Sequence, residues 1–362
     1  MIFNYYWSTI IDNPNHTFVI AEAGSNWKIG TFEEDLQQAK KLIHIASKCG
    51  ADAVKFQTYR SKSVYALKAG KSKYLLKQGI DDDINELFDK FSMPYKMIPE
   101  LSDYCKKEKI LFMSTPFSVE DAKQIDPFVS IHKVASYEIN HVRLLEFLAS
   151  TEKPIILSTG ASTYDDIDFA MEILKNHNVS KIGILQCTSK YPANFSSLNL
   201  NVIPNLKSRY GVAVGLSDHS ENPFIAPIMA VGLGATIIEK HFTLDRNLPG
   251  PDHAFALIPE ELTLMIDSIR NADLTKGTGQ KEILEEEKEL HEFATRSIQA
   301  ISKIKKGDIL KEGFNFEILR PGEQNRGLDA KFLNQVNGKR SIKDLDAGEG
   351  ITDFMWYFLQ IY

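Results

Sequence analysis

Residues 18–22 read FVIAE, a short apolar run that ends in a carboxylate, and seven similar runs follow between residues 53 and 241. Each run has the length and composition of a buried β-strand. A polar or charged group stands at the end of every run. In chain order these groups are Glu22, Lys55, Ser114-Thr115, Lys133 with Ser136, Ser158-Thr159, Gln186-Cys187-Thr188, Ser217-Asp218-His219 and Glu239-Lys240-His241. Polar groups gathered at strand ends predict a functional site there.

Helical patterns separate these runs. In the first of them, acidic residues follow Thr31, apolar residues recur at helical spacing, and Gly50 ends the pattern. Similar patterns occupy residues 142–150, 163–177 and 259–271. Strands that alternate with helices pair in parallel through right-handed crossovers. The sequence therefore predicts an α/β fold, a (β/α)8 TIM barrel over residues 1–272, whose active face lies at the carboxyl ends of the strands.

One interval of the predicted barrel is too long for a simple crossover. It runs from Gln57 to residue 110 and contains a lysine-rich stretch at 68–77 and three consecutive aspartates at 81–83. Long insertions in compact domains are commonly functional. We expect an extra helical excursion beside the active face.

The character of the chain changes after residue 272. Residues 273–293 are highly charged and poor in apolar side chains, as in an interdomain linker with a short helix. Residues 294–362 contain short β-like runs at 297–301 and 316–319, broken by glycine and proline turns. We expect a compact, turn-rich and β-rich second module there.

Composition limits the classes of function. The chain has 362 residues, of which 43% are hydrophobic and 25% charged, as in an ordinary globular protein. Its formal net charge of −6 gives no basic surface, so nucleic acid is not an expected partner. Anionic substrates must instead be met by local cations.

The sequence also indicates a compartment. Its three cysteines, Cys49, Cys105 and Cys187, form no disulfide or zinc pattern, which points to a reducing environment. The segment MIFNYYWSTI lacks the pattern of a signal peptide. The longest uncharged run, 222–238, contains prolines and glycines and predicts a buried helix and strand, not a membrane span. We expect a cytoplasmic protein without a membrane partner.

Two histidines stand at the ends of consecutive predicted strands. His219 follows Ser217-Asp218, and His241 follows Glu239-Lys240. Two imidazoles at adjacent strand ends can reach one ion and leave coordination positions open, as catalytic metal sites do. Imidazole suits Mn, Fe, Co or Zn better than Mg. The alternative is that each histidine is hydrogen-bonded at the root of a loop, but their pairing favours a metal.

Lys55 and Lys133 lie inside apolar strand-like runs, where burial of a charge without a partner costs free energy. Three interpretations are open. Both cations can clamp a phosphate and a carboxylate, or one can be a Schiff-base nucleophile. They can also form salt bridges to Glu22 and Glu239 in the mouth of the barrel.

Hydroxyl groups favour the phosphate clamp. Thr115, Ser136 and Ser158 stand at neighbouring strand ends and are donors of the kind that a phosphate accepts. Glu22 precedes the turn Gly24-Ser25-Asn26, which exposes its carboxylate. This carboxylate can orient a sugar hydroxyl or accept a proton from water, or it can simply pair with Lys55.

The ordered runs IAEAG, AVKFQT, STPFS, ILSTG, GLSDHS and EKHFTLDRNLPGPDH resemble the sialic acid synthase family, which makes nine-carbon 2-keto sugar acids. The resemblance covers nearly the whole chain. The second module, with its KKGD and RPG turns, resembles the antifreeze-like (SAF, or β-clip) domain that follows the barrel in that family. Six motifs in a fixed order are far more specific than any one of them.

The resemblance implies that phosphoenolpyruvate condenses with an open-chain N-acylated hexosamine, typically N-acetylmannosamine, and releases phosphate. It implies that His219 and His241 hold a divalent metal, Mn in the best-known members with Mg or Co as alternatives, which polarises the sugar aldehyde. The implied phosphoenolpyruvate-binding residues are Lys55, Thr115, Lys133, Ser136, Ser158 and Ser217. Those implied for the sugar are Glu22, which also helps to activate water, Gln57, Tyr191, Asp252, Phe293 and Arg320. Phe293 and Arg320 correspond to residues that reach the barrel of a partner subunit, so a domain-swapped homodimer is implied.

Three departures from the family pattern lie near the implied sugar site. Trp27 stands in the usual Asn-His-Asn-Gly segment, Ser189 replaces an asparagine, and the turn after Arg320 is longer, through Glu323–Arg326. The metal and phosphate positions are intact. Trp27 can stack on a deoxy or differently acylated sugar, so legionaminic and pseudaminic acid synthesis are alternatives. Core packing is the other interpretation of Trp27.

Two rival classes of function remain. A Schiff-base aldolase on the same barrel would use Lys133 or Lys55 covalently and need no metal. A non-catalytic carbohydrate-binding protein would use the second module alone, and has no need of paired histidines above paired lysines.

Overall fold

The computed structural model describes residues 7, 11, 13, 15–77 and 79–355, so the predicted domain limits at 1 and 362, and most of the segment 1–10, lie outside the described residues. The chain divides into two compact units, 1–277 and 278–362. No helix among the described residues has the length and apolar character needed to cross a bilayer.

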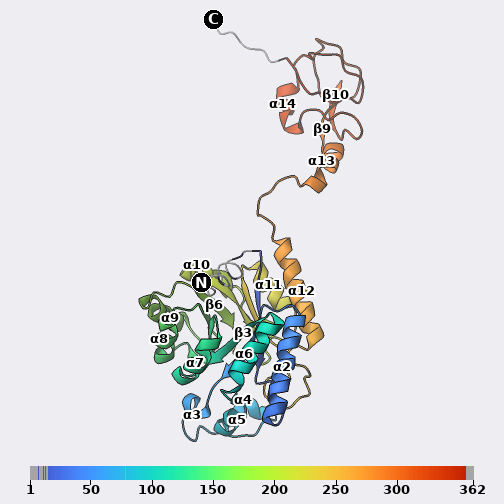
Figure 1. Ribbon diagram of the computed structural model, residues 1–362. Coiled ribbons are helices and arrows are strands. Elements are labelled where there is room, and N and C mark those ends of the chain that lie inside the picture. The colour runs from blue at the N-terminus through green and yellow to red at the C-terminus, as the bar shows by residue number, and fades with distance from the viewer. Residues whose placement is uncertain (1–6, 8–10, 12, 14, 78, 356–362) are drawn as a thin grey trace. The chain divides into compact units, whose positions relative to one another are not determined.

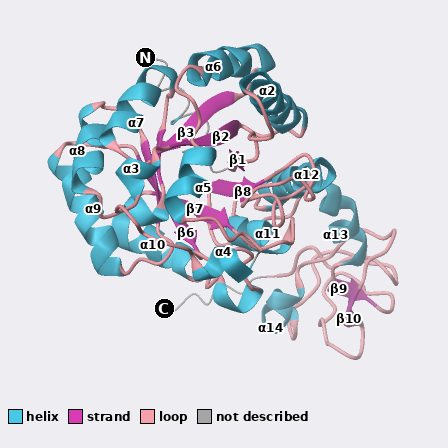
Figure 2. Cartoon of the chain, turned by 90° about the horizontal axis from the view of Figure 1, so that it is seen from below, coloured by secondary structure: helices cyan, strands magenta, loops and turns pink. Residues whose placement is uncertain are grey.

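The first unit is a barrel of parallel strands. Its strands are β1 (Phe18–Gly24), β2 (Ala53–Thr58), β3 (Leu111–Pro116), β4 (His132–Val134), β5 (Ile155–Ser158), β6 (Ile182–Cys187), β7 (Ala213–Asp218) and β8 (Ile237–His241). They pair in the order β3-β2-β1-β8-β7-β6-β5-β4, and β3 and β4 at the two ends of this order also lie in contact. Figure 2 shows the strands at the centre of a surround of helices. The predicted (β/α)8 fold is confirmed.

The outer layer consists of α2 (Phe32–Lys48), α6 (Met97–Glu108), α7 (Val119–Ile125), α8 (Val142–Ser150), α9 (Tyr164–Asn176), α10 (Val202–Tyr210), α11 (Ile225–Gly232) and α12 (Pro259–Thr275). The predicted start of the first helix is correct. Thr31 caps α2 and forms a capping box with Glu34, which satisfies two backbone groups at the helix start. The last helix runs a few residues past its predicted end, to Thr275.

The barrel has two apolar layers. One lies between the sheet and the helices, and the other fills the barrel interior and includes Trp7, Ile11, Phe18 and Ile237. Trp7 lies against Gly183, near the amino end of β6. Apolar packing therefore occupies the amino-terminal end, and the polar site lies at the opposite end.

The predicted excursion is also present. Residues 59–92 form α3 (Ser61–Val64), α4 (Lys73–Lys77) and α5 (Ile84–Lys90), which gather at one end of the barrel (Figure 1). They share a small apolar cluster in which Tyr59, Ile84, Leu87 and Phe91 are buried. This cluster makes the excursion a packed wall.

The second unit contains the short 3-10 helix η5 (Glu285–Glu287), which leads directly into α13 (Lys288–Ala294). An antiparallel pair, β9 (Ser297–Ala300) and β10 (Phe316–Leu319), and the helix α14 (Leu333–Val336) follow. Its own core includes Ile298, Leu310, Phe316 and Ile351. Isolated bridges, such as the one between Ile304 and Leu345, connect its turns. A small β-rich module fits the expected antifreeze-like domain.

Candidate active site

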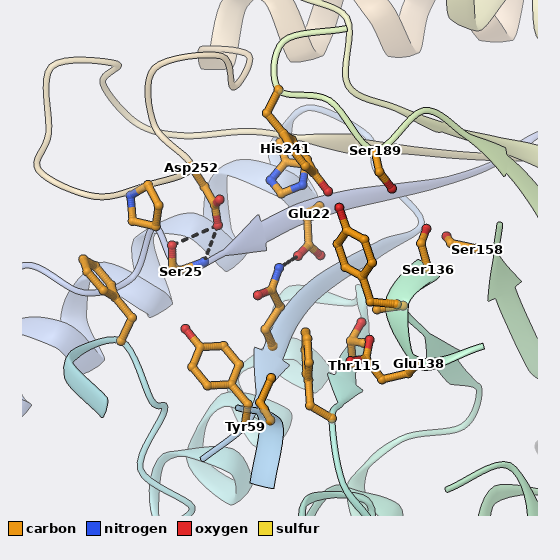
Figure 3. A pocket seen from close by; sticks show the side chains of 18 of the residues that line it. Glu22, Ser25, Tyr59, Thr115, Ser136, Glu138, Ser158, Ser189, His241 and Asp252 are labelled. Carbon is orange, nitrogen blue, oxygen red and sulfur yellow. Dashed lines mark hydrogen bonds between the residues drawn. The ribbon is translucent and has the colours of Figure 1, made fainter. Parts of the chain in front are cut away.

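A cavity of about 700 Å³ opens at the carboxyl ends of the barrel strands. Every residue predicted for the barrel part of the site lines it. These residues are Glu22, Lys55, Gln57, Thr115, Lys133, Ser136, Ser158, Tyr191, Ser217, His219, His241 and Asp252. Figure 3 shows several of them, including Glu22, Thr115 and His241. Phe293 and Arg320 belong to the second unit, where both are exposed.

Lys55 is the centre of a buried ionic cluster. It lies opposite Glu22 in the β1–β2 register, and its Nζ is 2.6 Å from Glu22 Oε2 and 3.6 Å from Glu239 Oε1. The same Nζ donates to Thr115 Oγ1 at 3.0 Å. Burial alone would lower the pKa of Lys55, but attraction to the two carboxylates outweighs it and raises the pKa. The predicted salt bridges are present, and Lys55 is a fixed cation.

Lys133 has a different environment. Its Nζ donates to Ser158 Oγ at 2.6 Å and to the Val134 carbonyl at 2.9 Å, while Glu239 Oε2 is 3.9 Å away. Burial lowers the pKa of Lys133, and the attraction of Glu239 only partly offsets this. A desolvated amine with a lowered pKa is the requirement for Schiff-base chemistry, so only Lys133 keeps that alternative open.

The two carboxylates of the cluster differ in their protonation. Burial raises the pKa of Glu22 well above its ordinary value, in spite of Lys55 and of the hydrogen bond from Gln57 Nε2 at 2.9 Å. For Glu239, attraction to Lys133 and Lys55 outweighs burial, so its pKa is lowered. Glu239 is therefore the counter-ion of the lysines, and Glu22 is the carboxyl that can exchange a proton near neutral pH.

The two histidine rings meet at one side of the cavity, with their centroids 5.5 Å apart. His219 Nδ1 donates to the Thr188 carbonyl at 2.8 Å, which leaves Nε2 available. Nδ1 of His241 is buried without a hydrogen-bond partner. Burial and the nearby Lys55 lower the pKa of His241 to about 3, so its ring is neutral and able to bind a metal.

Among the described residues, no group of three or more His, Cys, Asp or Glu side chains is arranged to hold a metal. Two adjacent imidazoles, one of them with an orphaned buried nitrogen, nevertheless fit a divalent ion. The other coordination positions would belong to water or substrate, as in an open catalytic site.

Asp252 is held in the cavity by the turn after β1. Its Oδ2 accepts hydrogen bonds from the backbone nitrogen of Ser25 at 3.1 Å and from Ser25 Oγ at 2.9 Å (Figure 3). Gly24 has a φ of +51°, and a Cβ added there would lie 2.6 Å from Asp252 Oδ2. Both the backbone conformation and the close approach of the carboxylate therefore require glycine.

Glu138 is a site residue that the sequence reasoning did not single out. It lines the cavity, is 8% exposed, and has one carboxylate oxygen without a hydrogen-bond partner. Burial raises its pKa to about 7, although Lys133 opposes the shift. Perturbed carboxyls in clefts are typical of catalytic groups. Its position two residues after the predicted Ser136 was the available signal.

The three departures have different structural settings. Trp27 is buried in the core between sheet and helices and is not among the residues that line the cavity, so core packing is its structural role. Ser189 does line the cavity, with its buried Oγ unpartnered. In the second unit, Gly322 donates to the Phe293 carbonyl at 3.0 Å, which ties the long turn to Phe293.

The excursion supplies an apolar lobe of the cavity, formed by Val64, Leu75, Ile84, Leu87 and Phe88. Among the described residues of 61–92 that line the cavity, none is charged. The charged groups of the cavity instead come from barrel strand ends and their loops. The cavity thus has a charged floor and an apolar wall.

Comparison with known proteins supports one family. The NeuB family model matches residues 42–281. The chain is 37% identical to a pseudaminic acid synthase of Campylobacter jejuni, over 93% of this chain and 95% of that protein. The chain belongs to the NeuB family. Another NeuB-family relative, the N,N'-diacetyllegionaminic acid synthase of Campylobacter jejuni, is also 37% identical, over 93% of this chain and 99% of the relative.

The barrel of this NeuB-family chain also has solved counterparts. The crystal structure of the spore coat polysaccharide biosynthesis protein SpsE of Bacillus subtilis aligns with a TM-score of 0.62 and 37% identity. The alignment covers 94% of this chain and 96% of that structure. Structural similarity therefore extends through both units of the NeuB-family chain.

Proposed function

We propose that this protein is a metal-dependent nonulosonic acid synthase that condenses phosphoenolpyruvate with an open-chain N-acylated hexose and releases phosphate. The observation that carries the proposal is the meeting of two buried lysines, several hydroxyl donors and two adjacent histidines in one cavity. Family membership supports the same reaction class.

Phosphoenolpyruvate would bind on the charged floor. Lys55 and Lys133 lie near different oxygens of Glu239, and each already donates a hydrogen bond to a hydroxyl group. A phosphate and a carboxylate offer more acceptor oxygens than Glu239 alone and would draw both ammonium groups. Thr115, Ser136, Ser158 and Ser217 would complete the anion site.

His219 and His241 would hold the divalent ion, with Mn as the first choice and Mg or Co as alternatives. Such an ion supplies Lewis-acid polarisation of the sugar aldehyde. The protein's own contribution is orientation: Thr188 fixes the His219 ring, and Tyr191 packs on it with ring centroids 4.0 Å apart.

The condensation joins the methylene carbon of phosphoenolpyruvate to the aldehyde carbon, and the aldehyde oxygen becomes a hydroxyl. Water adds to the former enol carbon and gives a tetrahedral intermediate that carries a hydroxyl and the phosphate group. Its collapse breaks the carbon–oxygen bond to phosphate and forms the keto group. Protons must move at three points: one reaches the aldehyde oxygen, one leaves the attacking water, and one leaves the hydroxyl of the intermediate as the phosphate departs and takes up a proton. Glu22 and Glu138 have raised pKa values and line the same cavity, which suits them to these transfers.

The apolar lobe favours a particular acceptor. Val64, Leu75 and Leu87 cannot hydrogen-bond to a hydroxyl-rich sugar tail but can pack on methyl groups. Among the described residues of 61–92 that line the cavity, only Tyr65 and Ser72 carry a hydroxyl. A 2,4-diacylamino-6-deoxy hexose has a methyl at C6 and acyl methyls, whereas N-acetylmannosamine has a C6 hydroxyl. We therefore propose a legionaminic- or pseudaminic-type product ahead of N-acetylneuraminate.

A domain-swapped homodimer is part of the proposal. Phe293 and Arg320 are exposed in the second unit and would complete the sugar site of a partner. Mixed dimers of Arg320→Ala and Glu22→Ala subunits test this, since one composite site would keep both wild-type residues. Restored turnover is expected, and none would show that Arg320 acts only within its own chain or not at all.

Borohydride trapping separates the synthase from a Schiff-base aldolase. Protein incubated with pyruvate, the keto acid with which an aldolase lysine would form an imine, and with each acceptor sugar, then reduced, should show no mass increase on Lys133. A covalent adduct at Lys133 that disappears in Lys133→Met, with turnover unaffected by metal chelation, would establish the aldolase instead.

A further inference from the structure

The buried ion pair between Asp218 and Lys240 lies just outside the cavity, between the two strand ends that carry His219 and His241. We propose that this pair is a positioning device that sets the spacing of the two histidine rings and thereby the affinity for the divalent ion. The inference rests on the metal site of the proposed function.

Strand register places the pair where it can do this. Asp218 on β7 lies directly opposite Lys240 on β8, neighbouring strands at the centre of the barrel view (Figure 2). Successive side chains of a strand point to opposite faces. In agreement, Ser217, His219, Glu239 and His241 line the cavity, whereas Asp218 and Lys240 do not. The residue beside each histidine thus points away from the site, toward its counterpart on the adjacent strand.

The Asp218–Lys240 pair is buried, and its charged groups form several hydrogen bonds. Asp218 is 1% and Lys240 2% exposed, and Lys240 Nζ lies 2.6 Å from Asp218 Oδ2. The ammonium group also donates to the Ser220 carbonyl, to Ser220 Oγ at 3.3 Å and to the Asn222 carbonyl at 3.4 Å. Its donors are therefore all directed at β7 and the turn that follows it.

Asp218 also forms hydrogen bonds to this turn, which follows β7. Its Oδ1 accepts from the Ser220 backbone nitrogen at 2.8 Å, and its Oδ2 accepts from Ser220 Oγ at 3.0 Å. His219 lies between these two residues in the chain. A side chain of β8 therefore fixes the backbone that carries His219, while the next residue of β8 is His241.

Stability alone does not explain such a pair. Buried ion pairs replaced by apolar side chains of similar size are often neutral or more stable, because desolvation offsets their attraction. The contribution of the pair is instead to fix the relative positions of the two strand ends that carry the histidines. Residues that orient metal ligands typically change metal affinity about 10- to 100-fold when they are replaced.

The test compares Mn²⁺ affinity by isothermal titration calorimetry in wild type, in the charge-free variant Asp218→Asn/Lys240→Met, and in Ser220→Ala. The double variant leaves no buried unpaired charge. A matched control is Asp126→Asn/Lys153→Met, which removes an ion pair of 2.8 Å that lies before β4, at the amino-terminal end of the barrel. Circular dichroism confirms that each variant is folded before titration.

We expect Mn²⁺ affinity about 10- to 100-fold weaker in Asp218→Asn/Lys240→Met, a smaller fall in Ser220→Ala, and no change in the Asp126/Lys153 control. Equal affinity in wild type and in the two test variants would overturn the inference and leave the metal site standing. Absence of Mn²⁺ binding by wild type would overturn the metal site and the inference together. A loss of affinity equal in the control variant would mean a general effect on folding and would also overturn the inference.

Discussion

Lys55 and Glu22 lie directly opposite each other on β2 and β1, and their Nζ and Oε2 atoms are 2.6 Å apart in the buried floor of the cavity. Glu239 lies 3.6 Å from the same Nζ. Glu22 and Glu239 thus surround one fixed cation, and Glu239 also lies 3.9 Å from Lys133 Nζ. Removal of one member of this cluster therefore leaves its neighbours without an ionic partner.

Lys55→Met should therefore remove both stability and activity. It leaves Glu22 and Glu239 partly uncompensated, and breaking a buried pair costs about 3–5 kcal/mol of unfolding free energy. Urea unfolding measures this, and phosphate release from phosphoenolpyruvate should fall below detection. Lys153→Met, a control at the far end of the barrel, should lose stability but keep activity. Turnover by Lys55→Met within tenfold of wild type would exclude Lys55 from the anion site.

The raised pKa of Glu138 predicts a pH dependence of stability. Below pH 4.5 the carboxyl is protonated in both folded and unfolded chains, and between about 4.5 and 7 only the folded chain keeps the proton. Unfolding free energy should fall through this window by about 3 kcal/mol, since a tenfold difference in proton affinity corresponds to about 1.4 kcal/mol.

Glu138→Gln should remove that part of the decline, as measured by urea unfolding at a series of pH values. Glu22 still titrates in this variant, so the decline becomes smaller but does not vanish. The exposed Glu172→Gln on α9 is the control and should follow wild type. An identical decline in Glu138→Gln and wild type would show that Glu138 ionises normally in the folded protein.

The contact between Ser25 and Asp252 predicts a selective effect on the sugar. Ser25→Ala loses one hydrogen bond to a carboxylate and should raise the KM for the acceptor sugar about tenfold, with the KM for phosphoenolpyruvate unchanged. Ser25→Thr keeps the hydroxyl and should recover most of the affinity. Equal increases in both KM values would mean a general disturbance of the cavity.

Gly24→Ala should be more damaging than Ser25→Ala. Its Cβ would collide with Asp252 Oδ2 at 2.6 Å and would strain a backbone with φ of +51°. Steady-state kinetics with varied sugar measures the loss. A Gly24→Ala enzyme with wild-type sugar KM would show that Asp252 does not hold the sugar.

Substitutions of Trp27 test whether its side chain packs in the core or contacts the sugar. Because it is 1% exposed and packs in the core, Trp27→Ala should cost about 3–5 kcal/mol of unfolding free energy. Trp27→Phe should cost less and leave the sugar KM as in wild type. A change in sugar preference in the folded Trp27→Phe enzyme would argue for a direct role in specificity.

Much of the site follows from strand periodicity. Polar groups at the ends of apolar runs such as 18–22 and 237–241 had to meet at one end of a parallel barrel, whatever the details of the helices. The position of the excursion follows in the same way, because a long insertion that starts at a strand end packs beside that end of the barrel. Here local pattern and overall topology lead to one prediction.

Loop residues were less predictable for a physical reason. Glu138 and Ser25 lie in turns after strands, where polar residues are common, and only tertiary packing makes them buried cavity residues. Trp27 had two equal interpretations because an aromatic ring suits a core and a sugar face alike. Likewise, the ion pair of Asp218 and Lys240 depends on the register between β7 and β8, which cannot be read from the amino-acid sequence alone.

The most direct test of the central claim is phosphate release from phosphoenolpyruvate by metal-stripped protein supplied with Mn²⁺ and one acceptor at a time. The acceptors are 2,4-diacetamido-2,4,6-trideoxymannose, its altrose isomer and N-acetylmannosamine, and His241→Ala is the matched control. We predict release that requires Mn²⁺ and one of the trideoxy sugars and is lost in His241→Ala. Release that is independent of sugar or of metal, or that persists in His241→Ala, would contradict the account.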